Sequence, residues 1–180
     1  MQQSKQLFTQ ISSDAQLEVS LQNVEIPEPK ANEVVVQIQA APINPSDMWP
    51  MFGPANLTQG ELDSDGLCFK APVFKAMLSR IKSRLDQLLP IGNEGAGVVV
   101  ATGNSEAAQA LLGKTVSVLT GAVFAEYVCV PLQACMVHNK NTTALQAASS
   151  FVNPLTALSM IETMRSEGHK AIIHTAAASN

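Results

Sequence analysis

The chain has 180 residues, of which 46% are hydrophobic and only 14% are charged, against about 25% charged residues in an average soluble domain. It is therefore long and apolar enough to bury a core, and it is not a disordered tail. The net charge is -4. Because a phosphate-binding surface needs a basic patch, this balance excludes nucleic acid as an expected partner.

The cysteines Cys68, Cys129 and Cys135 form no closely spaced pair. An odd number of separated cysteines is typical of reduced thiols, so we expect a cytoplasmic protein without a structural disulfide. We expect no secretory signal, because the N-terminus lacks a basic start followed by an apolar block. The longest uncharged run, 141–161, holds many polar residues. It is too polar to span a bilayer, and we expect no membrane partner.

The N-terminal part of the chain is predicted to be rich in strands. Segments 5–11 and 16–26 predict an antiparallel pair, because apolar residues such as Leu17 and Val19 alternate with polar neighbours in the second. A buried strand is expected at 33–41. From 42 to 66, Pro, Asn, Asp, Ser and Gly dominate the sequence, which predicts a loop of the kind that often carries function.

The segment 73–89 predicts an amphipathic helix, because six apolar residues recur at helical spacing among basic ones. We interpret the basic residues as the solvated face of this helix. Further strands are expected at 95–102, 114–119 and 124–131. Many short strands separated by glycine turns indicate a closed or nearly closed barrel.

Two helices and a strand are predicted near the C-terminus. Segment 143–151 begins with a Thr-x-x-Gln capping box. In the next helix we expect Asn153 as the cap, Pro154 at the first position and Gly168 as a left-handed end. The apolar run 171–174 predicts a strand. The small residues that follow it would let backbone amides approach a pyrophosphate.

Three motifs occur in a fixed order: APINPSD at 41–47, GNEGAG at 92–97 and NPLTAL at 153–158. Together they resemble the medium-chain dehydrogenase/reductase superfamily, within it the zinc-independent quinone oxidoreductase and enoyl reductase branches. The resemblance covers nearly the whole chain except an apparent helical insertion at about 56–89. It implies a mainly β fold with helices. A chaperonin-10 (GroES)-like, partly open barrel at 1–138 would precede the incomplete start of a Rossmann nucleotide-binding domain at 139–180.

The resemblance also implies an activity. The parent protein would be an NAD(P)H-dependent oxidoreductase that transfers hydride to a small molecule, either a quinone or an α,β-unsaturated carbonyl. NADPH is expected from the family branch and would bind between the two domains. This chain, which would hold only the start of the second domain, is expected to be inactive alone. We expect a homo-oligomer or a self-associating fragment.

The residues expected to be catalytic are Asn44, Ser46 and Asp47. The resemblance places Asn44 beside the nicotinamide ribose and ring, with Ser46 and Asp47 just behind it. Asn44 could equally be a turn asparagine that bonds its own loop. The loop 48–54 lacks the tyrosine found in enoyl reductases of the family. Trp49 and Phe52 could instead stack against a flat quinone or aromatic enone, or they could simply fill the underside of the loop.

The cofactor-binding residues implied by the resemblance are in part the same. Thr156 would approach the nicotinamide, although it could instead bond its own helix backbone. Backbone amides at the end of the chain would contact the pyrophosphate. The full expected cofactor set is Asn44, Asn153, Thr156, Ala177, Ala178, Ser179 and Asn180.

No zinc is expected. Zinc branches of the family carry a cysteine in the first motif and a His-Glu pair in the second, where this chain has Asn44 to Ser46 and Asn93 with Glu94. Glu94 could accept bonds from backbone amides. Two other functions stay open: a non-enzymatic barrel module that binds a protein partner through apolar surface after Lys140, and a zinc-type alcohol dehydrogenase relative with unexpected ligands.

Overall fold

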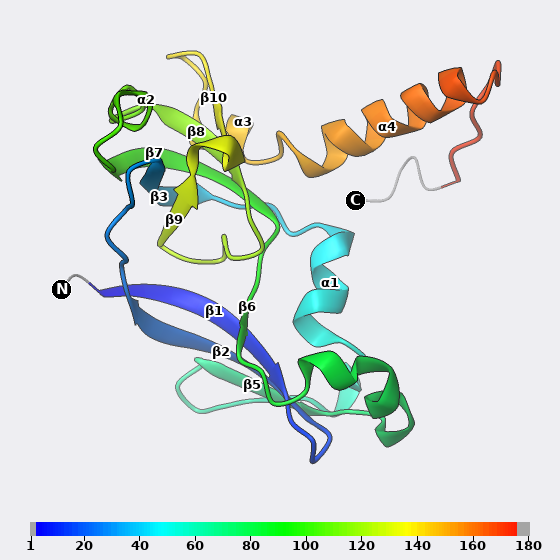
Figure 1. The fold of residues 1–180 in the computed structure, drawn as a ribbon. Coiled ribbons are helices and arrows are strands. Elements are labelled where there is room, and N and C mark those ends of the chain that lie inside the picture. The colour runs from blue at the N-terminus through cyan, green and yellow to red at the C-terminus, as the bar shows by residue number, and fades with distance from the viewer. Residues whose placement is uncertain (1–2, 176–180) are drawn as a thin grey trace.

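The computed structural model describes residues 3–175 and consists mainly of two five-stranded antiparallel sheets (Figure 1). The first has the order β4-β5-β2-β1-β6 and the second β10-β8-β7-β3-β9. The strands of the first sheet are β1 (Gln3–Ile11), β2 (Gln16–Glu25), β4 (Glu61–Leu62), β5 (Cys68–Pro72) and β6 (Leu89–Pro90). Those of the second are β3 (Glu33–Ala40), β7 (Glu94–Thr102), β8 (Thr115–Leu119), β9 (Tyr127–Pro131) and β10 (Cys135–Val137).

The two sheets are joined along β1. The amide of Leu7 donates to the carbonyl of Phe124 at 2.8 Å, and the amide of Glu126 donates to that of Lys5 at 2.9 Å. Each sheet has its own apolar cluster, and the Phe124 side chain packs against both. The expected mainly β fold with a partly open barrel is confirmed. The division at residue 138 into a GroES-like and a Rossmann part stays a prediction.

The predicted strands of the barrel are present. β1 and β2 form an antiparallel pair whose register runs from Gln3 opposite Glu25 to Ile11 opposite Leu17. β3 is central in the second sheet, between β7 and β9, and its three valines are buried. This burial on both faces explains why the valines follow one another without polar residues between them.

The predicted loop 42–66 is wrong in its first part, where the helix α1 (Pro45–Phe52) lies. Pro45 occupies the first helical position, and the Asp47 carboxylate accepts the backbone N–H of Asn44 at 2.7 Å. Asn, Pro, Ser and Asp are also the residues that begin helices. The same composition therefore predicted a loop where a short helix forms. Three-ten turns follow at Leu57–Gln59.

The predicted helix 73–89 is also wrong. The segment forms three-ten turns over Lys75–Arg84, interrupted at Ile81, where φ is -118° and ψ is 21°. Ile81 is the only buried residue of these turns, so the apolar positions do not form one continuous buried stripe. Segment 56–89 contains β4, β5 and three-ten turns instead of an α-helix. The interpretation of this segment as an insertion stays a prediction.

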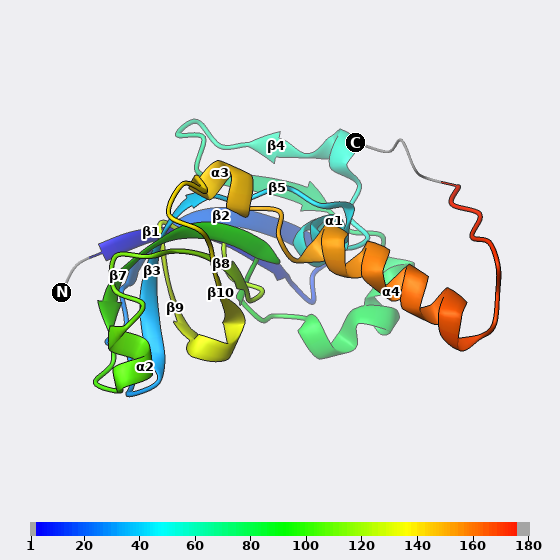
Figure 2. The same ribbon diagram turned by 90° about the horizontal axis from the view of Figure 1, so that it is seen from above.

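The helices of the second sheet and beyond are α2 (Glu106–Gln109), α3 (Ala144–Ala147) and α4 (Val152–Ser166), with a three-ten turn at Leu132–Ala134. The capping box of Thr143 and Gln146 is confirmed. Viewed from above, α4 leaves the barrel and runs outward (Figure 2). None of its residues is buried. No helix within 3–175 is long and apolar enough to cross a membrane.

Three details of the C-terminal prediction need correction. Helix α4 begins after Phe151, so Asn153 lies inside the first turn and does not cap the helix, and Pro154 is its third residue instead of its first. The segment 171–174 forms no strand. A strand needs a neighbouring strand for its backbone bonds, and none of the described strands lies beside it. The end at Gly168 is confirmed, with φ at 70° and the amide of His169 bonded to the carbonyl of Met164.

Candidate functional site

A buried polar network forms where the segment before α1, the first residues of β7 and the first residues of α4 meet. We call it the polar junction. At its centre lies Glu94, whose side chain is 0% exposed. One carboxylate oxygen accepts the Asn44 Nδ2 at 3.0 Å, and the other accepts the backbone amides of Phe151 at 2.7 Å and Val152 at 3.0 Å. A single carboxylate thus connects the barrel to α4.

Asp47 makes a second connection within the junction. Its side chain is 2% exposed, and its two oxygens accept the amide of Asn44 at 2.7 Å and the amide of Asn93 at 2.9 Å. Both oxygens therefore bind backbone groups of the first two sequence motifs. The side chain of Asp47 thus holds these two segments together.

Ser46 lies at the exposed edge of the junction. Its Oγ accepts the Nδ2 of Asn93 at 3.0 Å, which leaves the hydroxyl proton of Ser46 free to be donated elsewhere. Within residues 3–175, the oxygen of Ser46 is thus held by Asn93 while its proton has no acceptor.

The third motif meets the first through Asn153, whose Nδ2 lies 3.5 Å from Oδ1 of Asn44. Asn44 is 4% exposed, and its other contacts are within the junction. Thr156 is exposed and donates its hydroxyl proton to the carbonyl of Val152 at 2.6 Å, which confirms the helix-backbone alternative for this residue. Ala177, Ala178, Ser179 and Asn180 lie outside the described residues.

The central place of Glu94 was only partly foreseen. The expectation that it accepts backbone amides is confirmed, but its link to α4 and the contribution of Asn93 were missed. A signal existed in the sequence, because Glu94 is the only charged residue between Asp86 and Glu106. A charge within a glycine-rich apolar segment is buried at high cost unless it is fully hydrogen-bonded.

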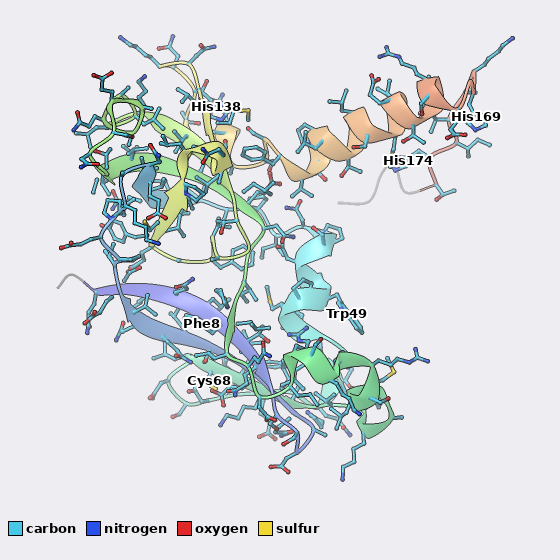
Figure 3. All side chains as sticks on the ribbon, viewed as in Figure 1. Phe8, Trp49, Cys68, His138, His169 and His174 are labelled. Carbon is cyan, nitrogen blue, oxygen red and sulfur yellow. The ribbon has the colours of Figure 1, made fainter. Side chains whose placement is uncertain are left out.

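The junction suits a neutral polar ligand better than an anion. Its two carboxylates repel phosphate, and the first amides of α4 already bind Glu94. No group of three or more His, Cys, Asp or Glu side chains within residues 3–175 could hold a metal ion. His138 lies on the barrel, away from His169 and His174 beyond α4 (Figure 3). Burial raises the pKa of Cys129 and of Cys135 to about 11, so both are protonated, weak nucleophiles at neutral pH.

The two aromatic residues of α1 have different environments. Trp49 is 54% exposed and projects from the helix into solvent (Figure 3). Phe52 instead packs edge to face on Phe69, with ring centroids 6.4 Å apart, as part of the first apolar cluster. Of the pair expected to stack on a quinone, only Trp49 is available.

No family model and no curated protein matches the chain, whereas many solved structures do. A protein assigned as an NADPH:quinone reductase from Mesorhizobium loti superposes with a TM-score of 0.61 and 24% identity over 92% of this chain. The quinone oxidoreductase from Coxiella burnetii gives 0.59 and 18% over 89%, and the CurK enoyl reductase gives 0.57 and 21% over 88%. The chain has the fold of the quinone and enoyl reductases.

The expected resemblance to these branches of the medium-chain superfamily is thereby confirmed at the level of the fold. The chain spans less than half the length of these solved structures, covering 45%, 46% and 41% of them. In this reductase fold, the three motifs found in the sequence converge on the polar junction.

Proposed function

We propose that this chain is the N-terminal, substrate-side part of a zinc-independent, NADPH-dependent oxidoreductase of the cytoplasm that transfers hydride to a quinone or an α,β-unsaturated carbonyl. The observation that supports the proposal is the polar junction, in which Asn44, Glu94 and the start of α4 lie within hydrogen-bond distance in a fold shared with quinone and enoyl reductases. In this proposal residues 1–138 form the catalytic domain and 139–180 begin the nucleotide-binding domain.

The residues at the edge of the junction fit the uncharged end of the cofactor. Asn153 and Thr156 are exposed and offer an amide and a hydroxyl to a nicotinamide ring and its ribose. We assign the buried Asn44, which is bonded to Asn153, to the same site, and none of the three carries a charge. Bound NADPH would supply the hydride. Its phosphates must lie away from the carboxylates of the junction. We assign them to the backbone of Ala177, Ala178, Ser179 and Asn180.

The substrate oxygen gains negative charge as hydride is added, and a fixed hydrogen-bond donor would stabilise that charge. Ser46 is the donor we assign to this oxygen, because Asn93 fixes its Oγ and leaves its proton free. Asp47 and Glu94 position the loop and the helix around it. Tyr127, the single tyrosine of the chain, lies in β9, where its hydroxyl accepts a hydrogen bond from Gln37 Nε2 at 3.1 Å, and we do not assign it this role.

Two measurements on the 180-residue protein test the proposal. We expect no oxidation of NADPH in the presence of a naphthoquinone or an enoyl thioester. We expect reduced nicotinamide mononucleotide to shift the NMR signals of Asn44, Ser46 and Asn153, whereas adenosine monophosphate should not. Rapid turnover by the chain alone, or the absence of any shift at these residues, would contradict the proposal.

A second candidate function is a barrel module that binds a protein partner, and the exposure of α4 favours it. Leu155, Leu158, Met160 and Ile161 are all between 38% and 52% exposed. If instead α4 belongs to a nucleotide-binding domain, these side chains should drive contact between copies of the chain.

Light scattering separates the two candidates. We expect association that increases with protein concentration and decreases in Leu158→Glu, with exposed Leu112→Glu as the control on the barrel surface. One defined monomeric species at all concentrations would favour the binding module.

A further inference from the structure

A pocket lies beside the C-terminal half of α1 and shares no residue with the polar junction. It has a volume of about 230 Å³, and its walls come from β1, α1, the turns before β6, and β6 with the residue after it. The residues that matter are Trp49, Pro50, Arg84, Leu89 and Ile91. Asn44 and Trp49 are five positions apart, which corresponds to about 8 Å along a helix. The pocket therefore lies close to the proposed reaction centre but has its own residues.

Among the described residues, Arg84 is the only charged one that lines this pocket. Its Nη1 donates to the carbonyl of Trp49 at 3.3 Å and its Nη2 to that of Pro50 at 2.8 Å. A guanidinium has five N–H groups, so most of its donors are still unused. Its Nε is the one buried side-chain nitrogen or oxygen within residues 3–175 that has no hydrogen-bond partner.

No carboxylate of the part of the chain that the structure describes forms an ion pair with this guanidinium. The two ion pairs within residues 3–175 are Lys70 with Glu18 and Arg165 with Glu162. Asp86, the acidic residue nearest in sequence, accepts the amide of Ser13 instead. Burial lowers the pKa of Arg84, as expected for a cation partly removed from water without a counter-ion. An anion at this position would restore the lost solvation.

The other walls of the pocket are apolar except for Thr9, whose hydroxyl already donates to the carbonyl of Met51 at 2.6 Å. Leu89 is partly buried, Ile91 is 2% exposed, and the indole of Trp49 borders the opening. A bare inorganic ion would leave these walls uncovered. A flat apolar body with one acidic group would cover them while its oxygens reach the fork of Arg84, which suits a carboxylate bidentately.

We propose that the pocket of Arg84 and Trp49 binds the carboxylate of a small planar, largely apolar molecule. For the reductase proposed above, on which this last step alone rests, the substrate would then be an acidic quinone or enone anchored at Arg84. Binding to the pocket requires neither NADPH nor turnover, so its test is independent of the test of the proposed function.

Trp49 is the single tryptophan of the chain, so its fluorescence reports on this pocket directly. Benzoate, its neutral counterpart benzamide and inorganic phosphate would be titrated into the 180-residue protein, below the concentration at which it associates. We expect a saturable fluorescence change with benzoate. Benzamide and phosphate should each bind at least about tenfold more weakly, because benzamide lacks the charge-assisted bond and phosphate lacks the apolar contact.

Arg84→Gln should weaken benzoate binding about tenfold or more, and Arg84→Lys should weaken it less, because the charge stays while the fork is lost. Arg80→Gln is the matched control, an exposed arginine of the same turns that does not line the pocket. Equal binding of benzoate and benzamide to the unmodified protein would overturn the proposal without any variant. So would phosphate binding as tight as benzoate, or unchanged benzoate affinity in a folded Arg84→Gln protein.

Discussion

Glu94→Ala is expected to lower the free energy of unfolding by about 3 kcal/mol or more. The substitution removes the acceptor of three donors, the Asn44 side-chain amide and the backbone amides of Phe151 and Val152, and leaves them in a buried site. For a chain of this size the melting temperature should fall by roughly 6 to 12 °C. Denaturant unfolding and calorimetry measure the two quantities.

Glu94→Gln separates the charge from the shape. The amide keeps one acceptor oxygen but places its own N–H donors against other N–H groups. We therefore expect a free energy of unfolding between those of the unmodified protein and of Glu94→Ala. Glu61→Ala is the control, since Glu61 is an exposed glutamate of β4 and its removal should cost little. Hydrogen exchange adds a local test. The amides of Phe151 and Val152 should lose protection in Glu94→Ala before the strands do, and unchanged protection there would show that Glu94 does not hold α4.

Gly97→Ala is expected to cost about 4 kcal/mol or more, enough to prevent stable folding of many domains of this size. A Cβ at this position would lie 1.8 Å from the carbonyl oxygen of Gln37 and 2.6 Å from its carbon, both backbone atoms of the neighbouring strand β3. Nothing flexible can give way. β3 is central in the second sheet, so the substitution must separate it from β7 or distort both strands.

Gly113→Ala is the matched control for a change of Gly to Ala. It has no atom within 4 Å of a new Cβ but a φ of 74°, so it tests the strain of the left-handed backbone alone, about 1 to 2 kcal/mol. Thermal unfolding of both variants measures the difference. If Gly97→Ala were no less stable than Gly113→Ala, the close approach of β3 and β7 would be wrong.

Periodicity predicted those elements whose side chains face one core. The pair β1 and β2 and the valine-rich β3 follow their sequence patterns, because alternation and burial are properties of each strand and its direct neighbour. The apolar residues of 73–89 fitted a helix equally well. Within the described turns, however, only Ile81 is buried, and Arg84 is held by carbonyls of α1. Such contacts between distant segments cannot be predicted from the spacing of apolar residues within one segment.

The candidate site was predicted in part for a related reason. The three motifs marked the segments that meet, and Asn44 and Asn153 do lie side by side. The motifs did not reveal which atoms bond. The true cap of α4 is the carboxylate of Glu94, which lies more than fifty residues earlier in the chain. A capping residue supplied by another strand cannot be recognised from the sequence next to the helix, so Asn153 was given that place.

The aromatic ring of Phe124 contacts the apolar clusters of both sheets. Neither cluster can open without exposing this ring, so the two sheets should melt as one cooperative unit in spite of their separate interiors. Helix α4 buries none of its residues and should therefore have a low local stability. It should open and close many times during the lifetime of the folded barrel, in local events that cost far less than global unfolding.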